Sequence, residues 1–207
     1  MGEYLRDGAE IYRRSFATIR AETDLSRIPP DLEVAVVRMV HACGMVDLVD
    51  DLDWSPGVGD IIRSALREGA AILTDSTMLA QGITRSRLPA DNAVVCTLVD
   101  DGVPQRSARI GTTRSAAAVD AWGSRLGGAV VAIGNAPTAL FRLLELLQDG
   151  PTPAAIIGMP VGFVGAAESK RVLTQQASRV PWLTVHGRRG GSAIAAAAVN
   201  ALASERE

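Results

Sequence analysis

The chain has 207 residues, 47% hydrophobic and 21% charged, a composition typical of one globular domain that we expect to span residues 1–207. A net charge of −2 and 4% aromatic residues argue against a nucleic-acid-binding surface, and no apolar run is long enough to cross a membrane. Cys43 and Cys96 form no metal or disulfide pattern and the N-terminus is polar, so we expect a cytoplasmic protein with reduced thiols and no metal site.

Two helices are predicted in the first 44 residues. The first covers 5–20, because apolar residues recur there at spacings of three and four, and Ser15 lies beside that stripe. The second follows Pro29-Pro30 and ends at Gly44, where glycine adopts the left-handed conformation without a steric penalty. His41 then falls in the last helical turn, with Arg38 one turn earlier on the same face.

The next 60 residues carry weaker signals. The acidic run 47–53 has no calcium-loop spacing, and we expect a solvated turn. A short helix is predicted from Gly59-Asp60 to Gly69, and a loop through Gly102 and Pro104.

From residue 70 onwards, short apolar segments alternate with amphipathic ones. The predicted strands are 70–74, 93–98, 129–133, 154–157 and 182–185, and the helices are 115–125, 138–148, 166–177 and 192–203. Thr112-Thr113 and Ser192 are expected as N-caps, and Pro137 at a first-turn position. Wholly apolar strands between helices indicate an α/β fold, a three-layer α/β/α domain with a mainly parallel sheet of about five strands and N-terminal helices.

Ligands of such sheets bind outside the carboxyl ends of the strands. Two glycine-rich segments lie there, 158–165 and 187–192, and each is either an anion site at a helix N-terminus or a tight turn that requires glycine. Neither contains a P-loop or a dinucleotide-binding motif. His186 has no evident partner in the sequence, and we interpret it as structural.

His41 is the candidate catalytic residue, because an imidazole exchanges protons near neutral pH and can serve as a general acid. Arg38 beside it suits an anionic ligand. The alternative is a surface histidine that completes a helix cap. The residues alone therefore indicate an α/β enzyme with one acid and several arginine sites, without naming a reaction.

Several segments resemble the precorrin-8X (cobalt-precorrin-8) methylmutase family of corrin biosynthesis. They occur in the family's order and span most of the chain, and they are Ser15-Phe16, Arg38-Met39-Val40-His41, Thr113-Arg114-Ser115-Ala116, 135–140, 160–170 and 187–192. The run 160–170 is the most specific of them.

The resemblance implies an isomerase that moves a methyl group from C11 to C12 of a tetrapyrrole, without an organic cofactor. It implies His41 as proton donor or acceptor, Ser15 and Arg38 as substrate-binding residues, Arg114 at the site, and a homodimer with active sites near the subunit interface. A phosphate- or nucleotide-binding α/β enzyme and a non-catalytic corrinoid carrier remain alternatives at this point.

Overall fold

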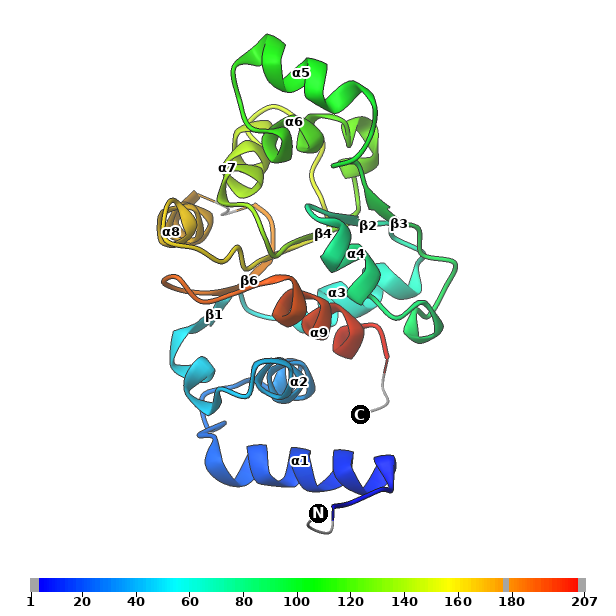
Figure 1. Ribbon diagram of the computed structural model, residues 1–207, viewed down its shortest axis with the longest axis vertical. Helices are drawn as coiled ribbons and strands as arrows, with labels where there is room; N and C mark the ends of the chain where they lie inside the picture. The colour runs from blue at the N-terminus through cyan, green and yellow to red at the C-terminus, as the bar shows by residue number, and fades with distance from the viewer. Residues whose placement is uncertain (1–3, 177–178, 205–207) are drawn as a thin grey trace.

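The computed structural model describes residues 4–176 and 179–204, and a six-stranded sheet runs through its middle (Figure 1). The strand order is β1-β6-β5-β4-β2-β3, and all neighbours are parallel except β1, which pairs with β6 in the antiparallel direction. The strands are β1 (Leu52–Trp54), β2 (Ile72–Thr74), β3 (Val94–Cys96), β4 (Val130–Ile133), β5 (Ala155–Gly158) and β6 (Trp182–Val185). The predicted α/β fold is confirmed, with one strand more than the five expected.

Helices cover both faces of the sheet (Figure 1). One side carries α5 (Gly102–Ile110), α6 (Arg114–Asp120), α7 (Pro137–Leu146) and α8 (Ala166–Gln176). The other carries α3 (Val58–Arg67), α4 (Thr77–Gly82) and α9 (Ser192–Leu202). There α2 (Glu33–Cys43) packs on α9, and α1 (Gly8–Glu22) packs on α2 as the outermost helix. In the ranges that the structure describes, no helix combines the length and the hydropathy that crossing a bilayer requires.

The central strands are apolar because both of their faces are covered. All residues of β2, β4 and β5 are buried. Alternate side chains of β4 enter different cores, Val130 and Ala132 on the side of α2 and α9, and Val131 and Ile133 on the side of α7. The sheet therefore separates two hydrophobic cores, and the larger one supports the N-terminal helices.

The acidic run was predicted wrongly. Residues Val46–Asp51 form a 3₁₀ helix, η1, and the next three residues form β1 instead of a solvated turn. The sequence Leu52-Asp53-Trp54 is too short to indicate a strand by itself. Antiparallel pairing with β6, in which Leu52 opposes Val185, decides its conformation.

Several helix boundaries also differ from prediction. Residues 102–110 are helical rather than a loop. Pro104 does not prevent the helix, because it lies in the first turn, where its missing N–H is not needed. The helix predicted over 115–125 ends at Asp120, and a separate 3₁₀ turn, η3 (Gly123–Leu126), follows it. The first helix begins and ends a few residues later than expected, and the predicted end of the 166–177 helix lies outside the described residues.

A carboxylate organises the carboxyl edge of the sheet. Asp75, buried after β2, accepts hydrogen bonds from the backbone N–H groups of Gly134, Asn135 and Ala136 at 3.0, 2.9 and 2.7 Å. Gly134 also lies against the start of α9, where a Cβ would come within 2.8 Å of Ser192 Cα. Ser192 was expected as the N-cap, but Gly191 takes that position and Ser192 Oγ lies 3.0 Å from Ser76 Oγ.

Candidate active site

His41 lies in the last turn of α2, as predicted, because Gly44 (φ 68°) ends the helix in the left-handed conformation. The helices α1 and α2 run antiparallel, so that Arg20 near the end of α1 pairs with Glu33 at the start of α2. The same arrangement brings Ser15 Oγ to 2.8 Å from His41 Nδ1. Because Ser15 occupies Nδ1, Nε2 on the other side of the ring is the nitrogen available to a substrate.

The buried ring of Phe16 supports both functional side chains. The imidazole of His41 meets it edge to face, with the ring centroids 5.2 Å apart. The guanidinium of Arg38 lies over the same ring at 5.3 Å from its centroid. Tyr12 adds a second aromatic contact, 5.5 Å from the imidazole. The imidazole of His41 and the guanidinium of Arg38 are therefore held side by side on one aromatic platform.

Two adjoining hollows open on this platform. The first, of about 360 Å³, is bordered by α2, α9 and the segment after α4, and its lining includes Arg38, His41, Ala193 and Asn200. The second, of about 540 Å³, is bordered by α1 and lies over Phe16. The two hollows share the side chains of Tyr12, Arg38 and Arg87. Cavities of this size accommodate small-molecule ligands.

Arg114 is not part of this arrangement within one chain. It is the exposed first residue of α6, which begins after the N-cap Thr113 as predicted. Figure 1 shows α6 at the opposite end of the molecule from α1 and α2. The structure thus brings Ser15, Arg38 and His41 together and leaves Arg114 elsewhere.

The second histidine has a partner that the sequence did not reveal. His186 Nε2 lies 2.9 Å from Asp53 Oδ2, and Asp53 belongs to β1, the strand that was not predicted. The pairing of β1 with β6 places this carboxylate beside the imidazole, so no local pattern around His186 indicates its partner.

The glycine-rich segment 187–192 packs against the loop after β5, where Gly191 N donates to Met159 O at 2.9 Å and Gly162 N donates to Arg188 O at 3.2 Å. A Cβ at Gly190 would come within 2.3 Å of Met159 O, so only glycine fits there. Arg189 pairs with Asp47 at 2.6 Å, and this guanidinium lowers the pKa of the Asp47 carboxyl. Arg188 is exposed and lies over the ring of Phe163 at 5.2 Å. Arg189 therefore forms an ion pair within the chain. The close approach at Gly190 favours the interpretation of this segment as a tight turn that requires glycine.

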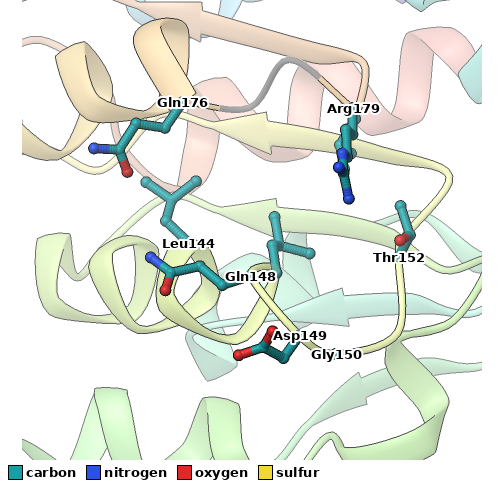
Figure 2. A pocket seen from close by; sticks show the side chains of 9 residues that line it. Leu144, Gln148, Asp149, Gly150, Thr152, Gln176 and Arg179 are labelled. Carbon is teal, nitrogen blue, oxygen red and sulfur yellow. The ribbon is translucent and has the colours of Figure 1, made fainter.

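A larger hollow lies away from His41. It has a volume of about 740 Å³ and lies near the amino ends of β5 and β6. Figure 2 shows Leu144, Gln148 and Gln176 along one side of it and Arg179 and Thr152 on the other. Its described lining brings together no serine–histidine pair, so volume alone does not locate the site. Nor do three or more metal-ligating side chains gather in any part of the chain that the structure describes.

The fold and the site define an α/β protein in which a histidine contacts a serine beside guanidinium groups, in a cleft open to a small molecule. Comparison with known proteins identifies the family within this class. Residues 10–205 match the family model CbiC, precorrin-8X methylmutase.

Individual relatives agree with the family match. The chain is 62% identical to the precorrin-8X methylmutase of Pseudomonas aeruginosa over 208 residues, covering 100% of both chains, and 58% identical to that of a Sinorhizobium species, covering 97% and 96%. It is 38% identical to the cobalt-precorrin-8 methylmutase of Salmonella typhimurium, covering 96% of both. A crystal structure of precorrin-8X methylmutase from Thermus thermophilus superposes with a TM-score of 0.86 at 37% identity, covering 94% of both chains.

The chain belongs to the precorrin-8X methylmutase family, and it is therefore an isomerase of cobalamin biosynthesis.

Proposed function

We propose that this enzyme catalyses the 1,5-sigmatropic shift of a methyl group from C11 to C12 of precorrin-8X, giving hydrogenobyrinate. The observation that carries the proposal is the Ser15–His41 contact of 2.8 Å beside Arg38 in one hollow. The reaction breaks the C11–methyl bond and forms the C12–methyl bond within one molecule. It needs no oxidant or leaving group, so a proton donor and groups that hold the macrocycle suffice.

His41 acts as the proton donor and acceptor in this proposal. Its Nε2 donates a proton to the ring system beside the migrating methyl group. It accepts a proton again as the product reaches its final tautomer. Ser15 holds the Nδ1 side of the imidazole and so fixes the ring orientation. The packing of His41 against Phe16 restricts its motion further.

Arg38 binds a carboxylate at the rim of the macrocycle. A guanidinium matches the geometry of a carboxylate in a bidentate pair, and the stacking on Phe16 orients it in advance. Because the chain has a net charge of −2, attraction of a polycarboxylate depends on such local cations.

Arg114 acts, we propose, in the active site of a second copy of the chain. It lines neither hollow of its own copy, and its helix α6 lies at the opposite end of the molecule from α1 and α2 in Figure 1. A homodimer in which α6 of one copy approaches the N-terminal helices of the other would bring it to the substrate. The proposal includes a cytoplasmic location, which Cys43 and Cys96 support because neither forms a disulfide.

The decisive experiment replaces His41 by Ala and follows the conversion of precorrin-8X by its absorbance spectrum. Turnover should fall at least about 10²–10⁴-fold, the usual contribution of a positioned acid–base group, while the Kd of the product stays measurable. His186→Ala is the matched control, since it alters the only other histidine, and it should remain active. Full activity of the His41→Ala variant would refute the assignment.

The metal-free substrate is the preferred form in this proposal. Relatives named for precorrin-8X are 62% and 58% identical to the chain, whereas those named for the cobalt compound include matches at 36% and 38%. Parallel assays with both forms test this preference, and a higher kcat/KM for the cobalt form would contradict it.

A further inference from the structure

The hollow over Phe16 is rich in arginine. Its lining contains four arginines, two from α1, one from α2 and one from the segment after α4: Arg13, Arg20, Arg38 and Arg87. Arg13 pairs with Glu10, and Arg20 pairs with Glu33 at 3.3 Å. No acidic side chain is among the described residues that line either hollow. A lining whose described residues include four guanidinium groups and no carboxylate suits an anionic ligand, because a guanidinium attracts a carboxylate and matches its geometry.

Arg87 occupies a special place among these arginines. Together with Arg38 and Tyr12 it borders both hollows, so it stands where a ligand beside His41 would extend into the hollow over Phe16. Its side chain is half-buried, whereas Arg85 two residues earlier is exposed and lines neither hollow.

The backbone that carries Arg87 is fixed. The amide of Asn200 on α9 accepts a hydrogen bond from Thr84 N at 2.8 Å and donates one to Gly82 O at 2.9 Å. The N–H of Arg87 in turn donates to Thr84 O at 3.0 Å, within the 3₁₀ turn η2 (Arg85–Arg87). In Figure 1 the segment after α4 extends towards the α1 side of the molecule. The position of Arg87 is thus set by α9, the helix that also lines the His41 hollow.

We propose that Arg87 is a further substrate-anchoring residue and that the hollow over Phe16 takes a carboxylate-bearing side arm of the macrocycle. This inference rests on the proposed function, because the macrocycle is the ligand whose ring lies beside His41. Arg38 and Arg87 hold carboxylates at the boundary between the hollows, and the ring meets His41 in the first of them. The number and spacing of the acidic arms would then contribute to substrate selection.

The test compares two ligands and three proteins. The ligands are hydrogenobyrinate and its derivative with all side-arm carboxylates converted to amides, each titrated by absorbance. The proteins are the wild type, Arg87→Met and the matched control Arg85→Met. Loss of one charged hydrogen bond should raise the Kd of the polyacid for Arg87→Met about 10- to 100-fold, with the Kd of the amide changed less than about threefold.

Two further readouts separate anchoring from a structural role. The Kd of the polyacid should depend less steeply on salt for Arg87→Met than for the wild type, because one screened attraction is gone. Thermal unfolding should show similar midpoints for the three proteins. If Arg87→Met does not fold, Arg87→Lys replaces it, and its polyacid affinity should fall by a smaller factor because the charge stays while the bidentate geometry is lost.

Each result bears on a distinct claim. Equal losses for the polyacid and the amide, or no loss for either, overturn the role of Arg87. If the wild type neither binds the product nor converts precorrin-8X, the proposed function fails, and this inference with it. If the wild type does both and Arg87→Met behaves like Arg85→Met, only the inference about Arg87 is wrong.

Discussion

At the scale of single residues, the environment of His41 is built from three weak features. A helix end places the imidazole, a serine on another helix contacts Nδ1, and the ring of Phe16 supports it from the side. None of them is specific by itself, since caps, exposed serines and buried phenylalanines are common. Their combination beside Arg38 is what indicates acid–base chemistry.

The serine contact can be tested by Ser15→Ala. Loss of the 2.8 Å contact should lower kcat about tenfold or more, because the imidazole is no longer held in one orientation, while the free energy of unfolding changes by less than about 0.5 kcal/mol. Steady-state kinetics and denaturation measure the two effects. Ser15→Thr, which keeps a hydroxyl, should recover part of the activity, and Ser64→Ala on α3 is the control. Unchanged kcat in Ser15→Ala would contradict an orienting role.

Lys170 supplies a prediction about pH. It is fully buried, its Nζ donates to Arg189 O at 2.6 Å, and burial lowers its pKa to about 8. Between pH 8 and 10.5 the unfolded chain keeps a proton that the folded chain has released, so Lys170 adds stability as pH rises through this window. The difference in the free energy of unfolding between the wild type and Lys170→Met should therefore shift in favour of the wild type as the pH rises from 7 to 10, by roughly 2–3 kcal/mol.

Urea denaturation at pH 7, 8, 9 and 10 checks this trend. Comparison with Lys170→Met removes the contributions of tyrosine and cysteine, and Lys170 is the only lysine of the chain. A difference between the two proteins that stays flat across the window would show that the burial of Lys170 leaves its titration unperturbed.

At the scale of elements, the site depends on a stack of helices on the sheet. The helix α9 packs on the sheet, α2 packs on α9, and α1 packs on α2. The position of His41 on α2 therefore depends on where α9 lies on the sheet. The start of α9 lies against Gly134, and the buried Asp75 accepts hydrogen bonds from the N–H groups of Gly134 and Asn135. Packing therefore connects the carboxyl edge of the sheet with the candidate site.

Asp75→Ala tests whether this carboxylate holds the carboxyl edge of the sheet. It leaves three backbone N–H groups without their acceptor, and the free energy of unfolding should fall by about 2–4 kcal/mol. Chemical denaturation measures the loss. The exposed Asp91, replaced in the same way, should change stability by less than about 0.5 kcal/mol. A loss no larger than that of Asp91→Ala would mean that the carboxylate does not organise this edge.

At the scale of the whole molecule, the separation of Arg114 from His41 is the central fact. The helix α6 and the pair α1–α2 lie on opposite sides of the sheet (Figure 1). A two-fold dimer repeats both ends, so it can form two composite sites, each with one end from either copy.

Complementation in mixed dimers tests the composite site. His41→Ala and Arg114→Ala should each be nearly inactive alone. After the two variants are mixed and allowed to exchange subunits, activity should return to roughly a quarter of the wild-type value, because half of the dimers then carry one intact site of two. Exchange is followed by a tag on one variant. Recovery that does not exceed the sum of the separate activities would place Arg114 outside the partner's site.

The sequence by itself determined the alternation of strands and helices, the end of α2 at Gly44, and the pairing of Arg38 with His41 on one helix face. These follow from local physics, because buried strands are apolar, glycine adopts the left-handed conformation, and residues three apart share a helix face.

Only the tertiary structure decided β1, the partner of His186, the burial of Lys170, the place of Arg87 and the separation of Arg114. Each of these depends on contacts between segments far apart in the chain, and no local pattern encodes them. A three-residue strand forms because β6 offers its edge, and a lysine is buried because a distant carbonyl accepts its hydrogen bond. Arg87 faces the hollows because Asn200 fixes the segment before it.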